Sequence, residues 1–173
     1  MRGILGLSLA VVVMSVGWGR ANAETWGVTD PAVATVEVSA LMGLEIKPGE
    51  RQHLPLRLDA GTTVGQFTMT NTSTVDIGGG HIGVTAGAAK YLTADGKSLL
   101  FVKKDDENQH IAVTVTGEGW TGPEVHNGVA MWILGSALAK GASTADTLLT
   151  AVNLTTNTPG EYETQLQATL NNI

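Results

Sequence analysis

Short segments in which polar and apolar residues alternate with a period of two recur along this chain of 173 residues. Successive side chains of a β-strand point to opposite faces, so this alternation is typical of strands with one buried face. The clearest segments are 32–40, 64–74, 111–116 and 161–170, and residues that favour turns separate them. Roughly seven or more short strands joined by turns predict one domain with an all-β sandwich fold.

Residues 53–58 also alternate, which places Leu54, Leu56 and Leu58 on one face of a predicted strand. Pro55 within this segment has no N–H to donate and therefore favours the edge of a sheet.

Three other segments give weaker patterns. The charge-rich segment 103–109 and the glycine-containing segment 117–128, which carries Trp120, are predicted to be loops. Segment 129–138 is apolar almost throughout, and its pattern leaves a helix and a buried strand equally open.

The first residues have the three parts of a cleaved secretory signal. Arg2 supplies the positive charge, residues 4–16 form the apolar run, and Ala21-Asn22-Ala23 supplies the small residues that a signal peptidase recognises. Gly17, Gly19 and Arg20 follow the run before it reaches the length of a membrane span. We therefore expect residues 1–23 to be removed and the remaining 150 residues to be exported, with a net charge of −8 instead of −6.

Composition excludes several classes of protein. The absence of cysteine excludes a disulfide framework, a thiolate metal site and a cysteine nucleophile. Lys and Arg total 10 against 16 Asp and Glu, which argues against a nucleic-acid binder because such proteins carry a basic face. The hydrophobic fraction of 43% is sufficient for a packed core.

No catalytic or metal-binding pattern stands out, so we expect neither an enzyme nor a cofactor. The carboxylate run 105–107 lacks the spacing of a calcium loop and is better interpreted as solvated. Tryptophans could stack on a sugar or pack in the core, and packing is the commoner role. None of the four histidines stands at metal-ligand spacing from another. The histidines are His53, His81, His110 and His126, and the three tryptophans of the expected mature chain are Trp26, Trp120 and Trp132.

The most informative features lie at the two ends of the expected mature chain. An extended segment, 24–41, contains an alternating face of small and medium residues, and the chain closes with TPGEYETQLQATLNNI, in which a turn leads into an alternating strand. Together with the signal and the Thr- and Gly-rich middle, these ends resemble the disulfide-free subunits of chaperone–usher pili.

The resemblance implies an incomplete immunoglobulin-like sandwich, formed by residues 42–173, with a groove beside its last strand. A periplasmic chaperone would fill this groove first, and the N-terminal extension of a neighbouring subunit would then replace it after passage through an outer-membrane usher. The implied donor face is Ala32, Ala34, Val36, Val38 and Ala40. The implied groove residues of the last strand are Gly160, Tyr162, Leu166, Ala168 and Leu170.

The expected function is therefore that of a structural subunit of a surface fimbria, with identical or sister subunits as partners and adhesion as its role. A tip adhesin of the same system, with a host receptor bound around Trp120 and the loop 117–128, is an alternative. A third reading is a secreted, self-contained β-sandwich binding module in which residues 32–40 pair inside their own chain.

Overall fold

The computed structural model describes residues 32–39, 43–126 and 129–170. The expected signal segment, residues 24–31 and Ala40 lie outside the described residues. The described residues form thirteen strands and one 3₁₀ turn: β1 (Ala32–Ser39), β2 (Leu44–Pro48), β3 (Gln52–Leu54), β4 (Arg57–Leu58), β5 (Thr63–Asn71), β6 (Ile82–Ala86), η1 (Ala89–Tyr91), β7 (Leu99–Lys103), β8 (Asp106–Thr116), β9 (Trp120–His126), β10 (Val129–Leu134), β11 (Thr147–Ala151), β12 (Thr155–Thr156) and β13 (Gly160–Leu170). No helix in this described part of the chain has the length and apolarity needed to cross a bilayer.

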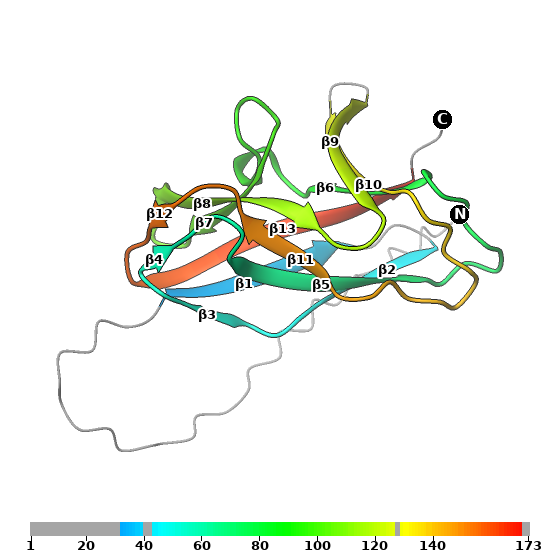
Figure 1. Cartoon of the computed structure of the whole chain (residues 1–173), viewed down its shortest axis with the longest axis horizontal. Coiled ribbons are helices and arrows are strands. Elements are labelled where there is room, and N and C mark those ends of the chain that lie inside the picture. Colours follow the sequence, from blue (N-terminus) through cyan, green and yellow to red (C-terminus); the bar gives the residue numbers. More distant parts are fainter. Residues whose placement is uncertain (1–31, 40–42, 127–128, 171–173) are drawn as a thin grey trace, which may run out of the picture.

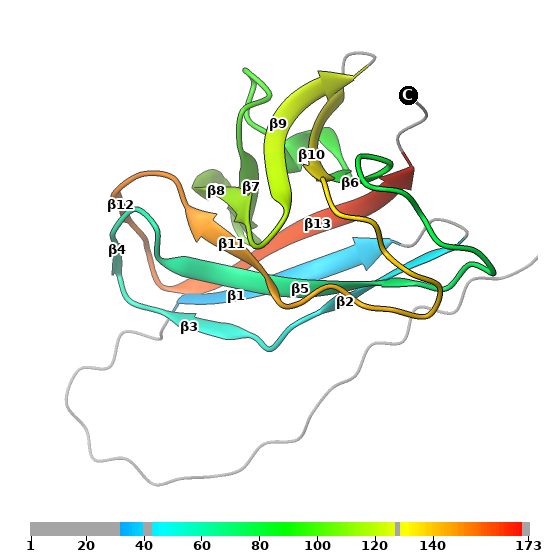
Figure 2. The same ribbon diagram turned by 45° about the vertical axis from the view of Figure 1, so that its right-hand side comes forward.

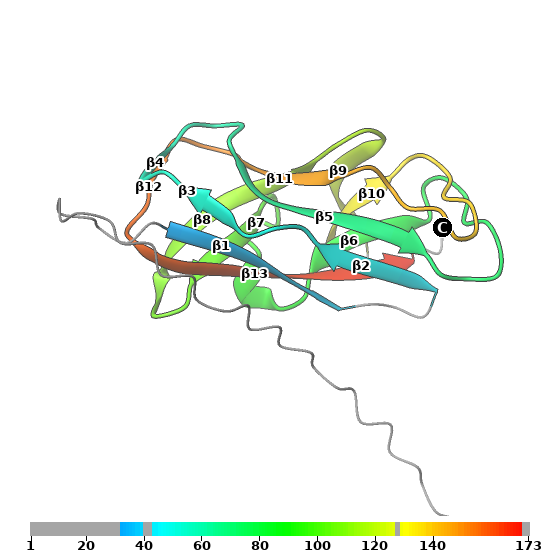
Figure 3. The ribbon, with the colours of Figure 1, turned by 90° about the horizontal axis from the view of Figure 1, so that it is seen from below.

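The main sheet folds back on itself into two facing layers. Its hydrogen-bonded order is β2-β5-β11-β8-β7-β13-β6-β10-β9, and β1 joins it by pairing with both β13 and β3. Strand β7 pairs with β8 on one side and with β13 on the other, so it connects the two layers. Figure 3 shows β1 and β13 along one side of the molecule and β5 and β11 along the other.

Contacts between the layers close a single core. The indole Nε1 of Trp132 on β10 donates a hydrogen bond of 3.0 Å to Thr114 Oγ1 on β8, across the sandwich. Phe67 on β5 meets the ring of Trp120 on β9 edge to face, with 5.9 Å between the ring centroids. The predicted all-β sandwich is confirmed, and its apolar faces meet in one continuous cluster.

Alternation in the sequence identifies the buried faces of the long strands. In β5, Phe67 and Met69 are buried, and Thr68 and Thr70, which alternate with them, are half-buried. In β8, Ile111, Val113 and Val115 are buried in the same way. One-sided burial of this kind is what a period of two predicts.

Two predicted loops are strands for most of their length. Segment 117–128 contains β9. In segment 103–109 only the tight turn between β7 and β8 is not strand, because β7 ends at Lys103 and β8 begins at Asp106. The glycines in the first segment and the charges in the second suggested turns, whereas pairing with β10 and β7 holds both backbones extended. Segment 129–138, for which a helix and a buried strand were both open, forms strand β10 followed by irregular chain.

The prediction of one strand over 53–58 is wrong. The chain forms β3 and β4 with Pro55 and Leu56 between them, and Leu54 and Leu58 are buried while Leu56 is 42% exposed. The break follows from Pro55, which cannot donate to a ladder. The carbonyl of Leu56 instead accepts a hydrogen bond of 2.6 Å from the N–H of Asn157.

Candidate functional site

Strand β1 lies in the groove between β13 and β3 of its own chain. It runs parallel to β13, with pairs from Ala32–Gly160 to Ser39–Gln167, and antiparallel to β3 over its first three residues. In Figures 1 and 2, β1 and β13 extend side by side along the molecule. Without β1, the edges of β13 and β3 that face each other would be unpaired.

The inward face of β1 is the alternating face noted in the sequence. Ala32, Ala34 and Val36 are buried, and Val38 packs half-buried against the core. Ala40, the fifth predicted donor residue, lies outside the described residues. This segment thus contributes directly to the core.

Gly65 on β5 makes room for the largest buried side chain of this face. A Cβ added at Gly65 would lie 3.0 Å from Val36 Cγ2 and 2.9 Å from Phe101 Cζ, so a larger residue would press on β1. Sequence reasoning did not select Gly65. A glycine inside an alternating strand is a known signal of close approach and could have indicated it.

The inward residues of the last strand continue the buried face of β1 in the same sheet. Tyr162, Leu166 and Ala168 are buried, and Leu170 is half-buried against the core. Gly160 begins the strand at φ +141°, a backbone conformation that favours glycine. The structure therefore brings the described members of the two predicted residue sets together, inside one chain.

Tyr162 fixes the turn that leads into β13. Its hydroxyl donates to the carbonyl of Thr158 at 3.0 Å and accepts from the N–H of Thr158 at 3.2 Å. A tyrosine near the start of the penultimate strand of immunoglobulin-like domains, bonded to the backbone a few residues upstream, forms a comparable corner. The bond sets the point at which β13 enters the groove.

Two hydroxyls at the seam between β1 and β13 are buried without a hydrogen-bond partner. They are Thr35 Oγ1 and Thr164 Oγ1, and among the described residues no other buried side-chain nitrogen or oxygen is in this position. The register places Thr35 beside Glu163 and Val36 beside Thr164, so both hydroxyls lie at the same level of the seam. A buried hydroxyl without a hydrogen-bond partner costs free energy, so these two threonines make the pairing of β1 with β13 less stable.

The outward face of β13 carries charge instead of apolar groups. Glu161 pairs with Lys104 at 3.1 Å and with Arg51, from the β3 side of β1, at 4.0 Å. Glu163 accepts a hydrogen bond of 2.8 Å from the hydroxyl of Tyr91. Burial raises the pKa of Tyr91, and its bond to Glu163 raises it further. Arg51 precedes β3 and Lys104 follows β7, so the ion pairs of Glu161 reach to both sides of β13 on its polar face.

No cluster of three or more His, Asp or Glu side chains in the described ranges could hold a metal ion. Trp132 is fully buried, and Trp120 packs half-buried with its Nε1 bonded to Thr147 Oγ1 at 3.0 Å. Trp120 therefore presents only part of its surface to solvent, the receptor surface around it stays a prediction, and Trp26 lies outside the described residues.

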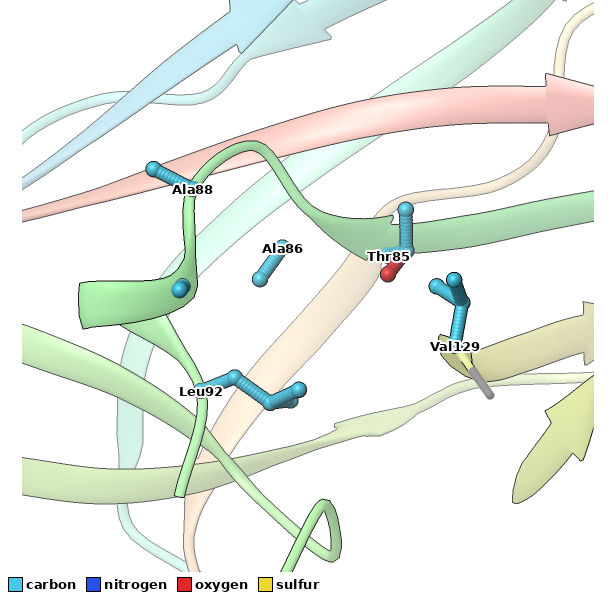
Figure 4. Close-up of a pocket in the computed structure, with 6 residues that line it drawn as sticks. Thr85, Ala86, Ala88, Leu92 and Val129 are labelled. Atoms are coloured by element: carbon cyan, nitrogen blue, oxygen red, sulfur yellow. The ribbon is translucent and has the colours of Figure 1, made fainter. Parts of the chain in front are cut away.

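A shallow hollow of about 200 Å³ opens beside β6. Figure 4 shows its lining side chains, which come from β6, from the turn that holds η1 and from the start of β10. Its one polar lining side chain, Thr85, already donates a hydrogen bond of 2.7 Å to the carbonyl of Ala130. The hollow offers no free polar group of its lining for ligand chemistry.

No protein-family model and no curated protein matches this sequence. Similar solved structures do exist. The minor tip subunit HdaB of the Escherichia coli Hda pilus has a TM-score of 0.55 at 12% identity, over 73% of this chain and 82% of that one. The Salmonella SafD adhesin has a TM-score of 0.52 at 17% identity, again over 73% and 82%.

AggB, the minor subunit of aggregative adherence fimbriae type I from E. coli, gives a TM-score of 0.52 at 14% identity, over 72% of this chain and 82% of that one. At such identities the likeness concerns the fold. It confirms the resemblance to pilus subunits at that level: this chain has the β-sandwich fold of fimbrial minor subunits and adhesins.

Proposed function

We propose that this protein is a subunit of a surface fimbria that assembles by donor-strand complementation, with segment 24–41 as the donor and residues 42–173 as the acceptor domain. The observation that carries the proposal is the place of β1, a terminal strand that fills the groove between β13 and β3. A strand attached at one end can be exchanged for the same strand of another copy, which is the principle of strand addition.

The energetics of the seam support a durable joint. Burial of a valine-sized side chain such as Val36 contributes about 1.5–3 kcal/mol. Each backbone hydrogen bond along a strand of 8 residues adds a net of about 0.5–1.5 kcal/mol. Summed along β1, these contributions favour a filled groove, whichever copy supplies the strand.

The partners follow from the same mechanism. Identical or sister subunits supply and accept strands, and a periplasmic chaperone protects the groove before an outer-membrane usher places the subunit in the fibre. The fimbria would then lie at the cell surface and support adhesion. The folds of HdaB, SafD and AggB, described as pilus or fimbrial minor subunits and an adhesin, support this assignment.

A second candidate is favoured by one observation. Because Ala32–Ser39 pair inside their own chain, the domain is complete without a neighbour, as a self-contained binding module would be. The two candidates differ in whether the strand ever leaves its own groove.

A capture experiment separates them. A tagged chain that lacks residues 24–41 is co-exported with untagged full-length chain, and copurification is measured after washing at high salt. The truncated chain has a groove and no donor, so it should retain the full-length chain in about equimolar amount.

Two single substitutions give matched donors. Val36→Lys introduces a charge at the buried position against Gly65 and should abolish capture, whereas Glu37→Lys places the same side chain on the exposed face and should preserve it. Equal capture of both variants would mean that β1 does not enter the groove of the other copy. A stable monomer with no capture of the unmodified chain would favour the binding module.

A further inference from the structure

The buried threonines of this chain bond their hydroxyls, with one exception. Four threonines of the described residues are buried. Three of them have a partner: Thr85 Oγ1 donates to the carbonyl of Ala130 at 2.7 Å, Thr147 Oγ1 accepts from the indole of Trp120 at 3.0 Å, and Thr150 Oγ1 accepts from the hydroxyl of Thr116 at 3.5 Å. The fourth, Thr164, is fully buried, and its Oγ1 has no hydrogen-bond partner.

Thr164 belongs to the groove and not to the strand that fills it. It lies on the inward face of β13 between Tyr162 and Leu166, and the register places it beside Val36 of β1. The described inward side chains of β1 are all aliphatic, so none of them can bond to this hydroxyl. The other unpartnered hydroxyl of the seam, Thr35 Oγ1, is part of β1 and would leave with it. A strand that replaced β1 would therefore meet the Thr164 hydroxyl again.

A small hydroxyl on the neighbouring strand is the group that would pair with Thr164. An unpaired buried hydroxyl costs free energy, and opposed threonine or serine side chains on adjacent strands bond to each other. This chain contains such a pair, because Thr70 Oγ1 and Ser143 Oγ lie 2.7 Å apart where their backbones form a bridge.

The space at this position limits the size of the side chain opposite Thr164. Val36 Cγ2 lies 3.0 Å from the point that a Cβ on Gly65 would occupy, so the valine already fills the room above β5. Threonine has the shape of valine and serine is smaller, whereas amide and charged side chains are longer and would press on β5. The site therefore favours serine or threonine.

We propose that Thr164 is a specificity-determining residue of the groove: it favours the strand of a sister subunit that presents serine or threonine beside it over the aliphatic strand of this chain. The proposal rests on the proposed function, since it needs a strand supplied by another chain. Selection of this kind works because the wrong strand leaves a desolvated polar group unpaired. The chain's own β1 is then the weaker occupant, which a sister strand displaces.

Substitutions in the full-length chain test whether the groove prefers a hydroxyl. Val36→Thr should leave the midpoint of urea unfolding unchanged or raise it, because the new hydroxyl pairs with Thr164. In a Thr164→Val background the same substitution should lower the midpoint, because the new hydroxyl then has no partner. Ala34→Ser is the positional control. It puts a hydroxyl beside Tyr162, whose own hydroxyl is bonded to Thr158, and should lower the midpoint in both backgrounds.

Two results of this series would overturn the inference. An equal fall of the midpoint for Val36→Thr in both backgrounds would show that Thr164 does not distinguish the two side chains. An equal fall for Val36→Thr and Ala34→Ser in the unmodified background would show that a hydroxyl is no better placed beside Thr164 than elsewhere in the groove. Neither result depends on assembly, so the proposed function would stand.

Peptides extend the test to a strand from another molecule. The acceptor is the full-length Val36→Lys chain, whose own β1 should be kept out of the groove by the charge at a buried position. Two labelled peptides copy residues 32–39, one with the native sequence and one with Val36→Thr, and fluorescence anisotropy measures their binding. The peptide with the added hydroxyl should bind about tenfold more tightly, and Thr164→Val in the acceptor should remove or reverse this preference.

The outcomes separate the inference from the proposed function. Equal affinities of the two peptides would overturn selection by Thr164 and leave strand complementation intact. Binding of neither peptide to an acceptor that unfolds cooperatively would contradict entry of a strand from another molecule, so the proposed function would fail and the sister donor with it. If the Val36→Lys chain does not fold, the urea series decides the inference alone.

Discussion

At the scale of single residues, the seam between β1 and β13 is dense but imperfect. Val36 fits against Gly65, whereas the hydroxyls of Thr35 and Thr164 are buried without partners. The seam is therefore stabilised by burial and weakened by unsatisfied polar groups. Under the proposed function, this balance would suit a strand that is held firmly and then exchanged.

The substitution Thr164→Val should stabilise the protein. It keeps the shape of the side chain and removes an unsatisfied buried hydroxyl, for which we expect a gain of about 1 kcal/mol in the free energy of unfolding. Chemical denaturation of the mature chain measures this change.

Thr114→Val is the matched control. It removes the acceptor of the Trp132 indole N–H and should lower the free energy of unfolding by about 1–3 kcal/mol. A loss of stability in Thr164→Val would show that its hydroxyl has a partner in solution.

At the scale of secondary-structure elements, the alternation in the sequence identified the inward faces of β1 and β13 because a period of two is a local property of a strand. Pairing partners and strand direction are not local. The sequence therefore could not indicate that β1 lies parallel to β13 and beside β3.

The same limit explains the elements that were missed. Strand β9 contains Gly122 and Pro123, which are typical of a loop. Its pairing with β10 nevertheless keeps the backbone extended. Strand β10 gave no clear period because it is buried on both faces. Met131 and Ile133 are as well covered as their neighbours.

The contact between β1 and β5 predicts coupling between two substitutions. Gly65→Ala places a methyl group 2.9 Å from Phe101 Cζ and 3.0 Å from Val36 Cγ2, and we expect a loss of about 1–3 kcal/mol from overpacking, part of it against β1. In a Val36→Ala background the methyl group has more space, so the loss should shrink by about 1 kcal/mol.

A double-mutant cycle measured by denaturation gives this coupling directly. Additive effects of the two substitutions would mean that β1 does not lie over Gly65 in solution.

At the scale of the whole molecule, this is a sandwich that uses its own N-terminal strand to complete one layer. A chain without cysteine gains stability from that strand instead of from a disulfide. Under the proposed function, the same strand would complete either its own copy or another. Closed monomer and assembled fibre would then differ in the origin of one strand and share the same core.

A reversible lock on β1 tests this account most directly. The register places Val33 beside Glu161, both on the outer side of the seam, and paired strands lie about 4.8 Å apart, within reach of a disulfide. In the variant with Val33→Cys and Glu161→Cys, the oxidised chain should contain one intramolecular disulfide and stay monomeric in light scattering during prolonged incubation. The reduced chain should form multimers that survive in detergent until they are heated. Equal assembly of the oxidised and reduced chains, or failure of the disulfide to form within the monomer, would contradict the account.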